Sequence, residues 1–350
     1  MSTTSAASAG LEKCPEEAAV LSELAGRSPR GSLEGKGASD GTKRHRHIPD
    51  RPEGSARGVA ARAGFPLVIP RIVTSLLFFA VLLFGLFSSW PGARYVILVM
   101  VGAATWVGTH EYYNLARRLK VRPSPWPGHS IALAFLVDAY FFGFGHFVHL
   151  FIACFWLLLF TQVFFKKIDR AVVNMACSIF GSVYVGLPMA ILLFLFKHAE
   201  DWGFAPPQAP AYAGGNLVIF LITTSWATDI GGYCFGRPLG RHKLAPALSP
   251  NKSIEGLAGG VALAVLAGLL LRLFWPGLDA MIGWGEAIAL PVLFSVLGTV
   301  GDLAESAFKR DAGVKDSGRT YTGHGGMLDI IDSILLCAPV FYLYLEMTRG

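Results

Sequence analysis

Apolar runs of roughly twenty residues recur from about residue 72 to the C-terminal end of this sequence. A helix of roughly that length crosses the hydrocarbon core of a bilayer and satisfies its own backbone hydrogen bonds there. Apolar residues make up 53% of the 350 residues and charged residues only 15%, which excludes the two soluble domains that this length would otherwise suggest. The sequence therefore predicts an all-α polytopic membrane protein.

Nine segments are expected to form the membrane-spanning helices, with ends predicted to within several residues. They are Ile72–Trp90, Tyr95–Tyr112, His129–Phe147, Leu150–Phe165, Met175–Lys197, Asn216–Phe235, Leu257–Trp275, Ala280–Gly301 and Leu328–Glu346. The third and fourth segments are alternatively one long hairpin whose tip is Gly145–His149.

Residues 1–63 lack apolar periodicity and are rich in Ser, Gly, Ala, Glu and Arg, a composition typical of disorder. We expect a disordered, polar and basic cytoplasmic tail here, followed by one transmembrane domain over residues 64–350. The basic cluster Lys43–His47 is expected to be solvated near anionic headgroups. The five cysteines are scattered and form no CxxC pair. We therefore expect neither a zinc site nor a disulfide framework.

Basic residues are concentrated in every second loop, and this pattern predicts the topology. The basic loops are Arg117–Arg122, Lys166–Arg170, Arg237–Lys252 and Lys309–Arg319, whereas the intervening loops are neutral or acidic apart from Arg94. Because cytoplasmic loops are enriched in Lys and Arg, this pattern places the basic loops and the N-terminus in the cytoplasm and the C-terminus outside. The expected location is the inner membrane of the cell.

Acidic residues interrupt the apolar segments near the C-terminal end, where a charge is costly and usually functional. If residues 302–309 are helical, one face of that helix carries Asp302, Glu305, Ser306 and Lys309. Carboxylate oxygens are the ligands that Mg²⁺ prefers, and Mg²⁺ often binds substrate phosphates as well. We therefore expect one or two Mg²⁺ ions, with a monovalent ion as an alternative, at Asp229, Asp302, Asp329 and Asp332.

Asp229 has Ser225 and Tyr233 one helical turn to either side, on the same face. A packing role, in which the hydroxyls bind the carboxylate, is the alternative to a metal site. His110-Glu111, near the end of the second span, is expected to be an interfacial pair.

The segment after Asp229 is suited to phosphate. Ser253 is expected to cap a helix with Glu255 in its first turn, and a helix N-terminus beside Lys252 favours an anion. Arg237 and Arg241 can fork onto phosphate oxygens, while lysines act as point charges. The sequence contains no P-loop, dinucleotide-binding or zincin motif. It therefore gives no indication of an ATPase, a dinucleotide-binding enzyme or a zinc protease.

Several spaced motifs resemble those of the phosphatidate cytidylyltransferases, also called CDP-diacylglycerol synthases. The segments Ser306–Arg310, Lys315-Asp316 and His324–Asp332 are similar to the family signature. Asp229–Gly236 and Ser249–Gly256 resemble two other shared motifs.

The sequence departs from that signature at two places. Ile330 stands where the family usually has an arginine, and Tyr321-Thr322 precedes the histidine in place of an apolar residue and Pro or Gly.

The resemblance implies a nucleotidyltransferase of phospholipid biosynthesis. It would transfer CMP from CTP to phosphatidic acid of the cytoplasmic leaflet, giving CDP-diacylglycerol and pyrophosphate with Mg²⁺. The catalytic residues expected from it are Lys309, Arg310, Lys315, Asp316 and His324. The substrate-binding residues expected are Ser225, Tyr233, Lys243, Ser249, Lys252, Ser253, Glu255 and Ser306.

Other functions stay open at this point. A CTP-dependent membrane kinase or transferase on another lipid or polyprenyl alcohol would share the nucleotide and metal site but needs a base for the hydroxyl. An ion-coupled transporter also carries intramembrane acids, although it commonly shows paired broken helices in two repeat halves, which this sequence lacks. A homodimer is an open alternative, and nucleic acid is not an expected partner because no soluble segment carries a basic stripe with aromatics.

Overall fold

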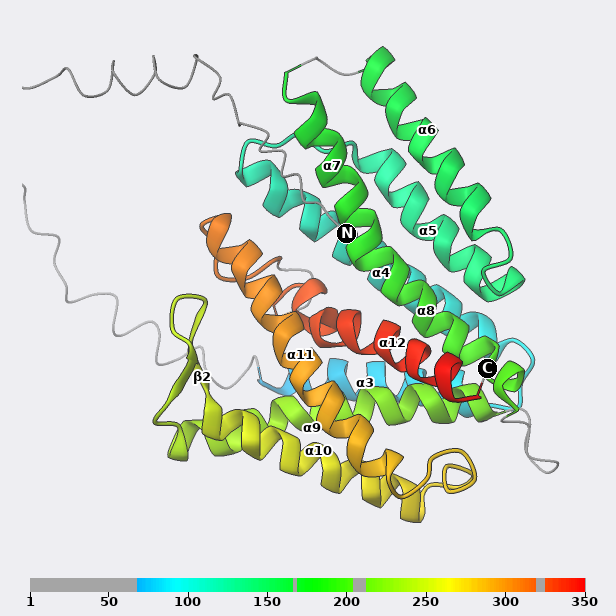
Figure 1. The fold of residues 1–350 in the computed structure, drawn as a ribbon, viewed down its shortest axis with the longest axis vertical. Coiled ribbons are helices and arrows are strands. Elements are labelled where there is room, and N and C mark those ends of the chain that lie inside the picture. Colours follow the sequence, from blue (N-terminus) through cyan, green and yellow to red (C-terminus); the bar gives the residue numbers. More distant parts are fainter. Residues whose placement is uncertain (1–67, 166–168, 204–211, 319–324, 350) are drawn as a thin grey trace, which may run out of the picture. The chain divides into compact units, whose positions relative to one another are not determined.

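The computed structural model describes residues 68–165, 169–203, 212–318 and 325–349 (Figure 1). The predicted tail, residues 1–63, lies outside the described residues. The helices and strands are α3 (Val68–Phe87), α4 (Ala93–Arg118), α5 (Pro125–Phe142), α6 (Phe147–Phe165), α7 (Ala171–Gly181), the π-helix η1 (Ser182–Gly186), α8 (Leu187–Lys197), the 3₁₀-helix η2 (Ala199–Trp202), α9 (Ala213–Leu239), β1 (Lys243–Ala245), β2 (Ser249–Ser253), α10 (Ile254–Phe274), α11 (Glu286–Asp311) and α12 (Leu328–Arg349).

Each predicted span falls on one of these helices when α7, η1 and α8 are taken as one continuous helix. Within the described residues, six helices are long and apolar enough to cross a membrane: α6, Ala171–Lys197, α9, α10, α11 and α12. The protein is thus a helical, multi-pass membrane protein. Membrane crossing by α3, α4 and α5 stays a prediction, because these helices are not among the six. The apolar part of α3 is the short segment Ser75–Phe87.

One predicted boundary is wrong. The span expected at Ala280–Gly301 is shifted, because α11 begins only at Glu286 and continues to Asp311. Gly283 and Gly285 favour a turn before the helix, and a side-chain oxygen of Glu286 accepts the backbone N–H of Gly283 at 2.6 Å. The shift leaves Asp302 well inside α11 rather than at the edge of a span.

The helix over residues 171–197 contains one widened turn, η1. Pro188 follows this turn, and a proline has no N–H to offer the carbonyl one turn back. The hydroxyl of Ser182 bonds to the carbonyl of Gly128 at 2.9 Å, and Tyr113 donates to the carbonyl of Ser178 at 2.8 Å. These contacts join the widened turn to α5 and the preceding helix α7 to α4.

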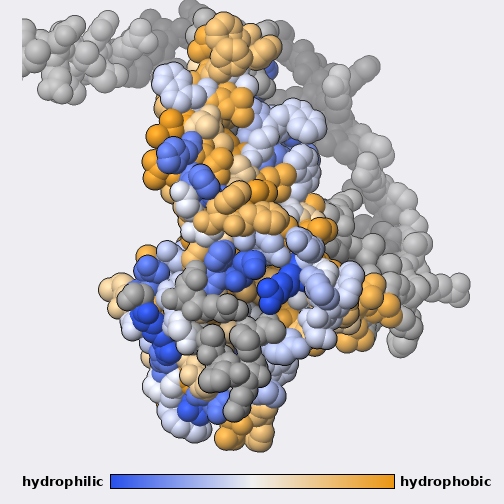
Figure 2. All heavy atoms as spheres, turned by 90° about the vertical axis from the view of Figure 1, so that its right-hand side faces the viewer, coloured by the Kyte–Doolittle hydropathy of each residue, from blue (hydrophilic) through white to orange (hydrophobic). Residues whose placement is uncertain are grey.

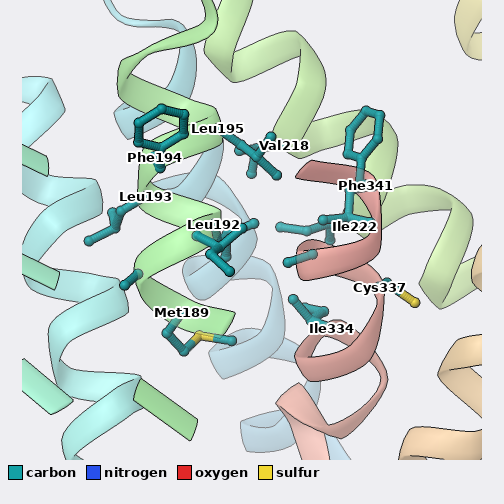
Figure 3. Close-up of a cluster of buried hydrophobic side chains, with 14 of the residues drawn as sticks. Met189, Leu192, Leu193, Phe194, Leu195, Val218, Ile222, Ile334, Cys337 and Phe341 are labelled. Carbon is teal, nitrogen blue, oxygen red and sulfur yellow. The ribbon is translucent and has the colours of Figure 1, made fainter. Parts of the chain in front are cut away.

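Part of the core lies between α8, α9 and α12 (Figure 3), and the same buried cluster extends to α4 and α5. Leu192, Val218, Ile222 and Phe341 come from α8, α9 and α12 and are all buried. In contrast, α6 leaves most of its large apolar side chains exposed, and hydrophobic residues lie openly on the face shown in Figure 2. Such surfaces are stable where hydrocarbon surrounds the protein.

Helices α9 and α10 pack along each other at the lower side of Figure 1. A Cβ on Gly231 of α9 would lie 2.6 Å from the carbonyl oxygen of Gly259 and 2.8 Å from the Cα of Gly260, both on α10. Only glycine permits this approach, which is a common way for membrane helices to associate.

Successive helices reverse direction, so the connections alternate between the two ends of the helices (Figure 1). The end of α4, the hairpin β1–β2, the end of α11 and the beginning of α12 lie at the same end. The hairpin is antiparallel and pairs Ala245 with Ser249; the sequence analysis predicted a loop there. This end of the helices gathers most of the residues that the sequence singled out.

Asp138 lies in α5, away from that end, and is buried. Its Oδ1 accepts the backbone N–H of His146 at 3.2 Å and lies 3.4 Å from the Nδ1 of the same residue. The carboxylate therefore holds the turn between α5 and α6.

Candidate functional site

A cavity of about 400 Å³ opens among the C-terminal parts of α9 and α11, the beginnings of α10 and α12, and the hairpin. Its charged and polar lining includes Thr228, Asp229, Tyr233, Asn251, Lys252, Ser253, Thr299, Asp302, Glu305, Lys309, Asp329, Asp332 and Ser333. Residues from three of the predicted motifs therefore share one cavity.

Three carboxylates form a cluster in this cavity. Asp302, Glu305 and Asp332 each offer one oxygen, and these oxygens lie within 4.8 Å of one another. Glu305 and Asp332 are buried, while Asp302 is half-buried. A Cβ on Gly301 would lie 2.6 Å from the carbonyl oxygen of Asp332, so α11 and α12 approach closely beside the acids.

Glu305 was not among the metal ligands expected from the sequence. Its position three residues after Asp302 on one helix face was the available signal. Among the described residues, Glu305 Oε1 is buried without a hydrogen-bond partner. A buried carboxylate oxygen without a donor is costly, and a hard cation satisfies it. The three carboxylates thus fit a divalent cation.

Lys309 lies next to this cluster and forms ion pairs with Glu305 and with Asp329, the latter at 2.5 Å. Asp329 also accepts hydrogen bonds from the backbone N–H of Gly326 at 2.7 Å and the hydroxyl of Ser317 at 3.0 Å. Asp329 thus lines the cavity and also fastens the beginning of α12. Its role as a metal ligand stays a prediction.

Lys252 reaches the same cavity from β2 and forms an ion pair with Asp302. Ser253, as expected, caps α10: its hydroxyl accepts the backbone N–H of Gly256 at 3.1 Å. The hairpin therefore delivers Lys252 beside the beginning of α10.

The hairpin is held at both ends. Glu255 accepts the backbone N–H of Arg241 at 3.1 Å and contacts Nδ1 of His242 at 2.6 Å. Arg310 donates from Nε to the carbonyl oxygen of Leu248 at 3.2 Å, near the turn of the hairpin. Glu255 and Arg310 thus lie outside the cavity lining and support the strand that carries Lys252.

The polar residues of α9 divide between core and cavity. Ser225 is buried and does not line the cavity, whereas Asp229 and Tyr233 do. The hydroxyl of Tyr233 accepts a hydrogen bond from Arg237 at 2.8 Å. On α11, the hydroxyl of Ser306 lies 3.4 Å from Oδ1 of Asp302.

Other expected site residues lie elsewhere. Lys243 and Ser249 belong to the hairpin but not to the cavity lining. Lys315 and Asp316 line a second cavity of about 720 Å³, together with Arg117 and Arg118. His324, with Arg319, Tyr321 and Thr322, lies outside the described residues. Their predicted roles stay predictions.

Ile330, at the position where an arginine is usual, lines a third, apolar cavity of about 70 Å³ with Trp226 and Ile334. An apolar side chain suits that lining, which lies on a different face of α12 from Asp329 and Asp332.

Glu111 of α4 was expected to pair at the interface with His110. It is buried instead, and it accepts hydrogen bonds from the hydroxyl of Ser317 at 3.2 Å and the backbone N–H of Leu328 at 2.8 Å. These partners are more than two hundred residues away in sequence, so no local pattern indicates them.

Comparisons with known proteins identify relatives of this chain. A 42% identical match over 166 residues, 47% of this chain and 55% of the relative, is "Phosphatidate cytidylyltransferase" of Brucella suis biovar 1. The protein of that name from Staphylococcus epidermidis RP62A is 42% identical over 135 residues, 39% of this chain and 51% of the relative. "Uncharacterized protein YnbB" of Escherichia coli K12 is 36% identical over 179 residues, 47% and 58% of the two chains. The chain spans about half the length of these curated relatives.

A profile described as the cytidylyltransferase family matches residues 69–348, which covers most of the chain and all the helices that form the cavity. The protein belongs to the cytidylyltransferase family.

Proposed function

We propose that this protein is a phosphatidate cytidylyltransferase. It transfers the cytidylyl group of CTP to phosphatidate and produces CDP-diacylglycerol and pyrophosphate. The observation that carries the proposal is the cluster of Asp302, Glu305 and Asp332 beside Lys252 and Lys309, in a cavity at one end of membrane-spanning helices. The names of the relatives support the choice of lipid substrate.

The reaction joins two anions. A phosphate oxygen of phosphatidate forms a bond to the α-phosphorus of CTP, and the bond from that phosphorus to the β-phosphate oxygen breaks, which releases pyrophosphate. Positioning and neutralisation of charge supply most of the catalysis in such transfers. The enzyme forms no covalent intermediate in this scheme.

The chain's residues serve these needs in separate ways. Asp302, Glu305 and Asp332 would hold Mg²⁺, which supplies charge neutralisation at the phosphates when bound. Lys252 and Lys309 place positive charge in the cavity, where it stabilises the phosphates and the departing pyrophosphate. Asp229 adds a fourth carboxylate on the α9 side.

We place the cavity at the cytoplasmic side of the inner membrane. The support is the excess of Lys and Arg in the connections at that end, including the hairpin and the segment after α11. CTP then reaches the cavity from the cytoplasm, and phosphatidate reaches it from the adjoining leaflet with its acyl chains in the bilayer.

The test uses the full chain in detergent micelles with labelled CTP, phosphatidate and Mg²⁺. Lipid-linked CMP and pyrophosphate are the expected products. Asp302→Asn and Asp332→Asn are each expected to lower the rate at least about a hundredfold, about 3 kcal/mol, because each removes a negative ligand from the cation.

The matched control is Asp279→Asn, since Asp279 is an exposed acid in the connection before α11, beyond the opposite end of that helix from Asp302. Its rate is expected to stay within about twofold of the parent, a difference of less than 0.5 kcal/mol. Product formation without a divalent cation, or full activity of the two cluster variants, would contradict the assignment of Asp302 and Asp332 as cation ligands.

A further inference from the structure

Glu111 is a buried carboxylate from a part of the chain that the proposed reaction does not use. Its side chain, on α4, is 3% exposed. A buried charge is destabilising unless hydrogen bonds compensate it, so its partners indicate what it does. Two of its partners are the hydroxyl of Ser317 and the backbone N–H of Leu328, which lie on either side of residues 319–324.

The N–H of Leu328 is one of the first in α12, and the first four N–H groups of a helix have no acceptor within it. Glu111 supplies that acceptor from another helix, at 2.8 Å, and a negative charge at a helix N-terminus is favourable. Glu111 therefore acts as a cap for α12 although it is not adjacent in sequence.

Ser317 connects this cap to the cavity. Its hydroxyl lies 3.2 Å from Oε2 of Glu111 and 3.0 Å from Oδ2 of Asp329. Asp329 in turn forms an ion pair with Lys309, and Lys309 forms one with Glu305 of the carboxylate cluster. A continuous series of polar contacts thus runs from α4 to the cluster.

The backbone around Glu111 provides a separate observation. A Cβ on Gly326 would lie 2.5 Å from Oε2 of Glu111, and a Cβ on Gly318 would collide with Oε1. The two glycines let the segments before and after residues 319–324 approach the carboxylate from two directions. A residue placed only to fill space would not need such close backbone approach.

We propose that Glu111 is a positioning residue for the carboxylate cluster. It fixes the beginning of α12 and Ser317. Through these contacts it orients Asp329, Lys309 and Glu305. The inference rests on the proposed function for its activity measurement. Residues that orient metal ligands commonly change metal affinity or activity by about 10- to 100-fold when they are replaced.

The variant is Glu111→Gln, which keeps the shape of the side chain but removes its charge. The matched control is Asp138→Asn, because Asp138 is also a buried carboxylate, 1% exposed, that accepts a backbone N–H. Thermal unfolding of both proteins shows how much stability each change removes.

The first measurement is the binding of Mn²⁺ to the full chain, followed by electron paramagnetic resonance without substrates. Glu111→Gln is expected to weaken binding at least about tenfold, and Asp138→Asn by less than about twofold. On an Asp329→Asn background, Glu111→Gln is expected to add less than about twofold, because residues that act through one another are not additive.

The second measurement is turnover, where kcat of Glu111→Gln is expected to fall at least about tenfold while the KM for CTP changes less than about threefold. Mn²⁺ affinity and kcat equal to the parent's, or losses equal to those of Asp138→Asn at equal loss of stability, would overturn the proposal.

If Glu111→Gln does not fold, Ser317→Ala replaces it and is expected to weaken Mn²⁺ binding at least about threefold; unchanged binding would then count against the proposal. A parent protein that binds Mn²⁺ but makes no lipid-linked CMP would contradict the proposed function alone, since the binding measurements still decide the role of Glu111.

Discussion

Lys252 and Asp302 meet inside the cavity although they come from a hairpin and from a helix that begins more than thirty residues later. Both side chains are about a quarter exposed, and ion pairs with that access to water contribute little to stability. The pair therefore matters for charge in the cavity more than for folding. In the proposed reaction Lys252 is available to the triphosphate once Asp302 binds a cation.

Lys252→Gln is expected to lower kcat/KM for CTP at least about tenfold, about 1.4 kcal/mol, with little change in the unfolding temperature. The reason is the loss of one positive charge beside the phosphates. Steady-state kinetics and thermal unfolding of the same preparation measure both quantities.

Lys120→Gln is the control, because it removes the same charge from an exposed position after α4 that lines none of the three cavities described. Equal kinetic effects of the two substitutions would show that the charge in the cavity has no special role.

At the scale of elements, the cavity depends on the close packing of α9 and α10. Gly231 sits against Gly259 and Gly260, and Asp229 and Gly232 on the same stretch of α9 line the cavity. Any separation of these helices would move Asp229 and the beginning of α10 relative to each other.

Gly231→Ala is expected to destabilise the protein by about 1–3 kcal/mol, because the added methyl group overlaps the backbone of α10. Gly102→Ala on α4 is the matched control: a Cβ there meets nothing within 4 Å, and alanine stabilises a helix by about 0.5–1 kcal/mol relative to glycine. Thermal unfolding in micelles should therefore shift in opposite directions for the two variants. A rise in the unfolding temperature for Gly231→Ala would contradict the packing argument.

At the scale of the whole molecule, alternating helix directions place the cavity residues from α9, β2, α11 and α12 at one end of the part of the chain that the structure describes. The proposed orientation has a direct consequence for accessibility. Asp311, exposed at the end of α11, should face the cytoplasm, and Asp279, exposed before α11, should face the outside.

Single cysteines at these two positions, in a chain whose own five cysteines are replaced, test the orientation with a membrane-impermeant maleimide. Intact cells should label Asp279→Cys at once, whereas Asp311→Cys should react only after the membrane is opened. The reverse pattern would invert the topology and place the cavity on the wrong side for CTP.

The helices and the family could be predicted from patterns in the sequence. Long apolar runs are a local property that the bilayer converts into helices, and each predicted span lies on a helix. The spacing of Asp302, Glu305 and Lys309 is also local, so their common face could be predicted from helix periodicity alone. The motifs from Asp229 to Asp332 were sufficient to indicate the family.

Which of these residues meet depends on the packing of the helices and could not be predicted. This packing joined Glu305 to Asp302 and Asp332 and brought Glu111 to Leu328. It also separated Lys315 from the cavity that holds Lys309. Such contacts depend on how closely particular helices approach, as at Gly301 and Gly326. That distance is a property of packing between distant segments, and no single stretch of sequence contains it.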